Sequence, residues 1–457
     1  MTQQSPPVLQ TESMPLRFWQ LTWPMLLGIG SLMTLHLADA VFVARLGEDA
    51  LATLSFLLPF GFVMIGVHIG LSVAISARVS RAIGAGDRTQ AACIIRTGVM
   101  LTVISSALVV SVGWFGQQLF LDALDMPTHL QPMAREWLVF WAFGSPLSAL
   151  QFISNSQLRA SGYPRSTGSI MISASLINIV LDPIFIFGIG SWQGLGLAGS
   201  ALASLLAWLI TGSYSLALLY RKGLLSGGDR QQQAELIKPL LQQAVPAIAT
   251  NMLPPLANAL LVKLTASFGT VAVAAMGAQV RLEFFLLLPV LAMTTSLPVI
   301  IGQELGKNNP ESARKAVWMA WKFALLSQLA AAVIVFIGNH SIAGWLVDHP
   351  DVRTVSAQLL AWLPWSYGML GVCMLSVSAL GAWLRTRTGL LVSSTRLFVL
   401  LLPLAWLSAQ LNGFDGQIIG MTIANIAAGS IALLIVLRVI KQEEQQNSES
   451  CKSATVQ

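Results

Sequence analysis

The chain has 457 residues, of which 55% are hydrophobic and only 10% are charged. A soluble globular domain carries roughly 25% charged residues. The composition therefore excludes a soluble globular protein and indicates a polytopic membrane protein. The net charge of +6 does not indicate a nucleic-acid partner, because the basic residues lie between apolar segments, where they act as topological anchors. The three cysteines show no metal or disulfide spacing, so neither a zinc site nor a disulfide framework is predicted.

Twelve apolar segments follow a polar tail of residues 1–15, and each is long enough to cross a bilayer as a helix of about 20 residues. The tail lacks the basic region and cleavage pattern of a signal peptide, so the first segment is predicted to remain as a helix. The predicted spans are residues 17–43, 51–77, 93–114, 137–158, 168–188, 197–219, 240–264, 272–300, 317–337, 356–381, 389–410 and 416–438. We therefore expect an all-α membrane protein with twelve transmembrane helices.

Lys and Arg gather in alternate connections between these spans. The connections after the even-numbered spans are basic, for example at Arg78 and Arg81, whereas the others carry acids such as Asp122 and Asp348. Because Lys and Arg are enriched in cytoplasmic loops, both termini are predicted to be cytoplasmic.

The longest polar connection, residues 221–239, has six predicted spans on each side. The expected parts are a cytoplasmic tail 1–15, an N-terminal lobe 16–220, a cytoplasmic linker 221–239, a C-terminal lobe 240–440 and a polar cytoplasmic tail 441–457. A shift of 222 residues superimposes Pro24 on Pro246, Gly47 on Gly269, Gly84 on Gly306, Ala91 on Ala313 and Arg165 on Arg387. We therefore expect two six-helix lobes related by a pseudo-two-fold axis along the membrane normal, facing one another across a cleft.

Two acids lie inside predicted spans of the first lobe without counterparts in the second. At the 222-residue shift Asp182 falls on Leu404, and Asp39 falls on Leu261, or on Asn258 by the local match of LADA to LANA. A charge at the bilayer centre costs about 2.5–3.5 kcal/mol on insertion scales, and such residues usually face the bundle interior or a cavity. The first lobe is therefore predicted to hold a polar site.

The neighbours of the two acids indicate what this site binds. Counted from the outer ends of their spans, both acids lie at a similar depth, about 9 Å inward at 1.5 Å per residue. Asn178 lies one turn before Asp182, and Pro183 frees the carbonyl of residue 179 from the helix. Asp39, Asn178 and Asp182 would then form an oxygen-lined site for H⁺ or Na⁺. His36, one turn from Asp39, is either a proton relay or a packed or solvated side chain.

A third acid inside a span, Glu283, lies in the second lobe. Arg281 is two residues away and therefore on a different face of the helix. A partner from another helix, such as Lys263 or Arg396, would make Glu283 part of a structural ion pair. Otherwise Glu283, Arg281 and Arg396 would contact the substrate, and the residues alone leave both roles open.

Six segments spread over the chain form a characteristic set. They are the first span with Pro24 and Asp39, GAGDRTQAA after the second span, LRASGYPRST after the fourth, NIVLDPIFIFG in the fifth, LAGSALAS opening the sixth and GQELGKNNPESARKA after the eighth. Together they resemble multidrug and toxic compound extrusion (MATE) transporters, in particular the DinF-like branch. The resemblance covers residues 15 to 440 and implies a secondary antiporter, not an enzyme, without a cofactor. It would export amphipathic organic cations in exchange for H⁺ or Na⁺ by alternating access.

The resemblance also implies roles for individual residues. Asp39, Asn178 and Asp182 match the polar cluster of the family's N-terminal lobe, and Ser204 stands where the family often has Thr. Asn155, near the end of the fourth span, also fits this cluster.

Pro24 matches the proline at which the first helix of the family is thought to bend on protonation. Two carboxylates in one poorly hydrated pocket repel, so Asp39 and Asp182 are expected to titrate as a unit. We hypothesise that the deprotonated pair carries the cation and that protonation from outside bends the first span and expels it. The chain departs from the family in two ways. Leu35 replaces a common tyrosine, and spans 7 and 10 lack the carboxylates that another branch of the family uses there.

The alternative function is a flippase for lipid-linked oligosaccharides or related lipids. Such flippases belong to a related superfamily with a similar two-lobe plan. A flippase needs several cavity-facing cations, and the candidates here are Arg281, Arg396 and Lys263. A membrane enzyme would need Asp-rich or His-rich motifs, whereas a channel stays open as an alternative. Short loops and the resemblance indicate a location in a bacterial inner membrane. The expected partners are small-molecule organic cations and membrane lipid, and the protein is expected to be a monomer.

Overall fold

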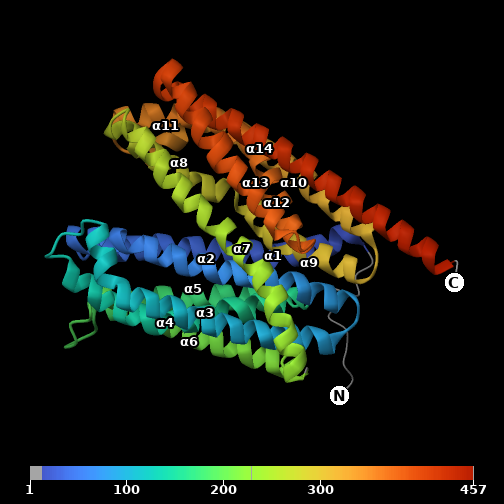
Figure 1. Ribbon diagram of the computed structural model, residues 1–457. Helices are drawn as coiled ribbons and strands as arrows, with labels where there is room; N and C mark the ends of the chain where they lie inside the picture. Colours follow the sequence, from blue (N-terminus) through green and yellow to red (C-terminus); the bar gives the residue numbers. More distant parts are fainter. Residues whose placement is uncertain (1–12, 228, 456–457) are drawn as a thin grey trace. The chain divides into compact units, whose positions relative to one another are not determined.

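The computed structural model describes residues 13–227 and 229–455, and nearly all of them are helical (Figure 1). Backbone groups find no water inside a bilayer, so an apolar chain satisfies them within helices. In chain order the elements are α1 (Met14–Ala44), α2 (Glu48–Gly84), α3 (Arg88–Ala123), α4 (Gln131–Ala160), α5 (Pro164–Phe187), α6 (Leu197–Arg221), α7 (Arg230–Ala266), α8 (Thr270–Leu286), α9 (Leu288–Gly306), α10 (Pro310–Leu346), α11 (Pro350–Trp362), η2 (Leu363–Ser366), α12 (Tyr367–Ala382), α13 (Thr386–Ser394), η3 (Thr395–Leu401) and α14 (Leu402–Thr455).

Eleven of the described helices are long and apolar enough to cross a membrane. One of these stretches, Thr386–Gln445, contains two spans, because the backbone leaves helical geometry at Asn412 and Gly413. A Cβ atom added to Gly420 would stand 2.4 Å from the carbonyl oxygen of Leu404, whereas a straight helix would hold these residues about 24 Å apart. The chain therefore folds back at the break. The prediction of an all-α protein with twelve transmembrane segments is confirmed.

Several spans of the second half are interrupted. The helices α8 and α9 are separated only by Leu287, and a proline, Pro289, is the second residue of α9. A proline also stands at the start of the 3₁₀ turn η2, between α11 and α12, because a residue without an N–H is tolerated at the first turn of a helix. The segment η3, which contains Arg396, is a π-helical turn, a feature often found at functional sites.

The helices divide into two units, one up to Asn251 and one from Met252. The division falls inside α7, which begins at Arg230, within the polar stretch expected to be a linker. The first part of α7 belongs to the N-terminal unit because Leu240 is buried in a cluster with Ile75 and other residues of α2 and α3. Each unit thus has its own helical core.

The backbone repeats at the spacing that the sequence indicated. Asp87 precedes α3 and accepts a hydrogen bond from the backbone N–H of Gln90 at 2.8 Å, and Asn309, 222 positions later, precedes α10 and accepts one from Ser312 at 3.1 Å. Side-chain caps of this kind satisfy the free N–H groups of a helix start. Positive φ angles recur at the same spacing in the pairs Gly47 and Gly269, Gly86 and Asn308, and Gly162 and Leu384.

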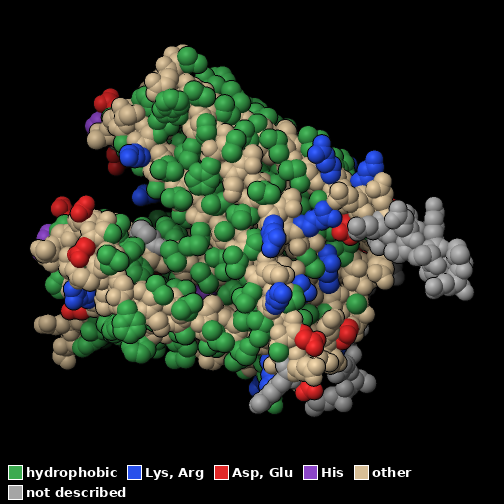
Figure 2. Space-filling view, in the orientation of Figure 1, with side chains coloured by type: hydrophobic (Ala, Val, Ile, Leu, Met, Phe, Trp, Pro, Cys, Tyr) green, Lys and Arg blue, Asp and Glu red, His purple; other side chains and the backbone are tan. Residues whose placement is uncertain are grey.

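Large apolar side chains are exposed along the spans. Phe115 is 87% exposed and Trp345 is 95% exposed. Figure 2 shows hydrophobic side chains, in green, over much of the visible face. Soluble monomers rarely expose apolar patches of this extent, whereas lipid accommodates them. The chain is an integral, multi-pass membrane protein.

Candidate functional site

The helices α1 and α5 pack along their lengths and run in the same direction. A Cβ atom added to Gly168 of α5 would stand 2.5 Å from the carbonyl oxygen of Pro24 in α1, so the absence of a side chain allows the close approach. Further along, the Ser175 hydroxyl donates a hydrogen bond to the Ser31 hydroxyl at 3.2 Å. The contacts in order along both helices are Gly168 with Pro24, Ser175 with Ser31, and Asp182 with Asp39.

The carboxyl groups of Asp39 and Asp182 lie within hydrogen-bonding range of one another. Asp182 is fully buried and Asp39 is half-buried. The Oδ1 atom of each receives no hydrogen bond from a protein donor in the described part of the chain. Because an ionised carboxylate only accepts hydrogen bonds, two of them cannot satisfy one another. A proton shared by the pair, or a bound cation, would satisfy both oxygens.

Asn178 holds the other oxygen of Asp182, and Ser204 in turn holds Asn178. The Asn178 amide donates to Asp182 Oδ2 at 2.8 Å. Its carbonyl oxygen accepts from the Ser204 hydroxyl at 2.9 Å and from the Ser204 backbone N–H at 3.1 Å. This amide orientation follows from the network, because the carboxylate accepts and the backbone N–H can only donate. The network connects α5 to α6 and fixes the Asp182 side chain.

The remaining first-lobe candidates are His36, Asn155 and Pro24, and the last two contact α5 at Thr167 and Gly168, roughly 20 Å along the helix from Asp182. His36 is exposed and lies one helical turn before Asp39. Asn155 is buried in α4, where its backbone carbonyl accepts a hydrogen bond from the Thr167 hydroxyl at 3.2 Å. The Asn155 Oδ1 atom has no hydrogen-bond partner among the described residues, so no bond joins it to the acid pair. Pro24 lies inside α1, where it contacts α5.

Glu283 belongs to a separate polar cluster in the second unit. Its carboxylate accepts a hydrogen bond from the Tyr367 hydroxyl at 3.0 Å, and this hydroxyl also accepts one from the Gln279 amide at 2.5 Å. The charge of Arg396 acts on Glu283 without an ion-pair contact between them in the described part of the chain. Arg281 is exposed. Glu283 is thus held by a tyrosine rather than by the ion-pair partner considered from the sequence.

Sequence reasoning missed Tyr367 and Gln279 as partners of Glu283. Gln279 precedes Glu283 by one helical turn, which is a signal that could have paired them. Tyr367 lies 84 positions away from Glu283, and no local pattern indicates that contact.

The fold and the site together define a twelve-span transporter-like membrane protein whose first unit holds a paired carboxyl site. Residues 24–184 and 246–407 match the MatE family model, and the starts of the two stretches are again 222 residues apart. These stretches cover more than half of the chain. The protein belongs to the MATE family of transporters.

The proteins most relevant for comparison match nearly the whole chain. A protein of Shewanella oneidensis named as an FAD transporter is 32% identical over 91% of this chain and 93% of its own length. The crystal structure of the Vibrio cholerae MATE transporter VcmN in the bent form is 33% identical, with a TM-score of 0.88, over 94% of this chain and 97% of that one. A MOP superfamily transporter from Pyrococcus furiosus shares the fold, with a TM-score of 0.89 at 21% identity, over 97% of this chain and 99% of that one.

Proposed function

We propose that this protein is a secondary antiporter that exports amphipathic organic cations in exchange for H⁺. The contact between Asp39 and Asp182, whose Oδ1 atoms receive no hydrogen bond within the described residues, is the observation that carries the proposal. Two ionised carboxylates repel in a poorly hydrated site, and a proton or a cation relieves the repulsion. Binding of the one therefore opposes binding of the other. Na⁺ is the alternative coupling ion, with oxygen ligands from Asp39 and Asp182, and the Asn178 oxygen would join them only after turning away from Ser204.

In the proposed cycle, protonation from outside neutralises the acid pair and α1 bends at Pro24. The contact of Pro24 with Gly168 supports this step, because a bend there moves α1 against α5. Proton release inside then resets the site. Exchange of one H⁺ for one monovalent cation moves no net charge, so only the pH gradient drives it. Exchange of two H⁺ moves one net charge, and the membrane potential then adds about 2.3 kcal/mol of driving force per 100 mV.

A second candidate substrate is a flavin dinucleotide, because the relative that is 32% identical is named as an FAD transporter. A dinucleotide carries a pyrophosphate, so its binding requires cationic groups where an organic cation requires anionic ones. Arg281 is exposed, and the buried Nε atom of Arg396 has no hydrogen-bond partner among the described residues. These two arginines are the candidates for such a contact.

The test is uptake into inverted membrane vesicles that contain the protein, with ethidium and FAD supplied separately under an imposed H⁺ or Na⁺ gradient. We expect the H⁺ gradient to drive ethidium uptake, and Asp39→Asn or Asp182→Asn to abolish it. Asp415→Asn, which changes an exposed acid on α14, is the matched control and should leave uptake unchanged.

Three results would count against the proposal. Wild-type uptake in either Asn variant would remove the acid pair as the coupling site. If FAD but not ethidium were taken up, and if Arg396→Gln abolished that uptake, the dinucleotide rather than an organic cation would be the substrate. Uptake that is indifferent to both gradients would exclude antiport and favour a channel or a flippase.

A further inference from the structure

A groove runs between two helices of the second unit, α13 with its continuation η3 on one side and the last part of α14 on the other. Its volume is about 290 Å³. The Arg385 guanidinium at the start of the first helix donates a hydrogen bond to the side-chain oxygen of Gln442 in α14 at 2.8 Å. Because the chain folds back at Asn412 and Gly413, the two helices run in opposite directions, and this bond joins them at the end that holds Arg385 and Gln442.

The groove changes character along its length. Arg385 and Arg438 line one end, and Leu391, Ile431 and Ile435 line the remainder. Ile431 precedes Arg438 by seven residues, so the apolar part extends about 10 Å beyond the guanidinium along α14. A ligand that fits this groove has an anionic end and an apolar chain.

The charges at the polar end are unevenly neutralised. Arg385 has Gln442 as a hydrogen-bond partner and Glu443 at 3.9 Å. Arg438 is exposed and makes no hydrogen bond or ion pair with any residue that the structure describes. A guanidinium pairs with a phosphate through two parallel hydrogen bonds, and basic pockets between transmembrane helices are suited to anionic lipid head groups.

We propose that this groove is a binding site for one anionic glycerophospholipid of the adjoining leaflet. One acyl chain would lie against Leu391, Ile431 and Ile435, and the phosphate would contact Arg438 and Arg385. The proposal concerns the lipid contacts of the second unit and does not depend on the coupling ion or on the exported substrate.

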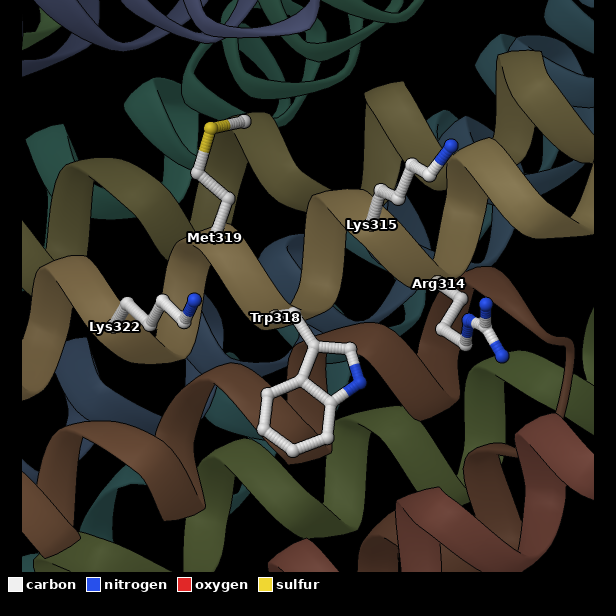
Figure 3. A pocket seen from close by; sticks show the side chains of 5 residues that line it. All are labelled: Arg314, Lys315, Trp318, Met319 and Lys322. Carbon is white, nitrogen blue, oxygen red and sulfur yellow. The ribbon is translucent and has the colours of Figure 1, made fainter.

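A second basic hollow, on α10, lacks the features that support lipid binding. Its volume is about 450 Å³, and Figure 3 shows Lys315 and Lys322 on either side of Trp318. All of its lining residues come from α10, so no second helix forms an apolar wall. Two of its cations are already paired, Arg314 with Glu444 at 3.2 Å and Lys315 with Glu311 at 2.7 Å. The hollow therefore serves as an internal control for surface charge.

The experiment is native mass spectrometry of the purified full-length protein titrated with phosphatidylglycerol or with phosphatidylcholine of the same acyl chains. We expect the wild type to retain one phosphatidylglycerol in preference to phosphatidylcholine. Arg438→Gln should lower the phosphatidylglycerol affinity about fivefold or more, the effect of one cation near a lipid phosphate. Ile435→Trp fills the groove but keeps the charges, and should lower the affinity for both lipids. Lys322→Gln, with the same change of charge on α10, should have no effect.

The proposal is overturned if Arg438→Gln binds phosphatidylglycerol as the wild type does, or if Lys322→Gln weakens binding equally, because the effect would then be diffuse surface charge. Binding of soluble glycerophosphate at the lipid's affinity would reduce the site to a phosphate site. Unaltered thermal unfolding midpoints separate each of these outcomes from misfolding.

Discussion

The packing of α1 against α5 makes a quantitative prediction for Gly168→Ala. The new Cβ atom would lie 2.5 Å from the carbonyl oxygen of Pro24 and 2.8 Å from its Cβ. Carbon atoms prefer separations of about 3.5–4.0 Å, so α1 and α5 must move apart by about 1 Å. Since both close atoms belong to a proline in a helix, neither can rotate out of the way.

The expected loss of stability follows from two opposing effects. Overpacking of a tight contact costs about 1–3 kcal/mol. Replacement of a helical glycine by alanine returns about 0.5–1 kcal/mol, because alanine loses less backbone entropy on folding. At the middle of both ranges the net change is a destabilisation of about 1 kcal/mol, which is roughly fivefold in the unfolding equilibrium. Gly116→Ala in α3 is the control, because a Cβ atom there meets nothing within 4 Å, and it should be neutral or stabilising.

Buried cysteines provide the assay. Cys93 lies in the first unit and Cys373 in the second, and both are buried, so a thiol-reactive dye labels them when their unit opens. In a background with Cys373→Ser and Cys451→Ser, the thermal midpoint of Cys93 labelling reports on the unit that contains Gly168. This midpoint should fall in Gly168→Ala and not in Gly116→Ala.

Equal midpoints for the two alanine variants would refute the reasoning. Such a result would mean that α1 and α5 do not approach each other closely at Pro24. The bending step of the proposed cycle would then lose its structural support, whereas the acid pair would be unaffected.

Three further predictions concern caps and polar contacts. Asp87→Ala and Asn309→Ala should each lower the free energy of unfolding by about 1 kcal/mol, because the two residues are equivalent N-caps. Thermal unfolding of the two variants measures both losses, and clearly unequal losses would contradict the prediction. Tyr367→Phe should destabilise the second unit by about 1–3 kcal/mol, since Glu283 loses its hydrogen-bond donor. Dye labelling of Cys373 measures this loss, and an unchanged labelling midpoint would contradict it. Ser204→Ala should slow gradient-driven transport about two- to tenfold, because Asn178 loses the hydrogen bond from the Ser204 hydroxyl but keeps the one from the backbone N–H. A complete loss of uptake into vesicles would contradict this.

The fold was largely predictable because the bilayer imposes strong local constraints. Segment length and apolar composition identify spans without knowledge of their neighbours, and the hairpin at Asn412 and Gly413 agrees with the separation of the last two predicted spans. The repeat was visible because turns and caps require particular residue types at particular positions. Breaks inside spans, such as the π-helical turn that carries Arg396, were not predicted, since they depend on packing against other helices.

Part of the candidate site was also accessible from the sequence. A carboxylate inside an apolar span is costly wherever it packs, so Asp39 and Asp182 were identifiable one at a time, and helical rise placed them at equal depth. The neighbour Asn178 followed from the helical period. Contacts across helices did not, as the separate location of Asn155 and the pairing of Tyr367 with Glu283 illustrate.

The sequence by itself thus determined the number of spans, the duplication and the presence in one half of two acids without counterparts in the other, because each depends on local composition and spacing. Only the tertiary structure decided that Gly168 lets α1 meet α5 in register, and that this register brings Asp39 into contact with Asp182. The physical reason is that helix contacts are set by the shapes of two surfaces together. No single segment carries that information.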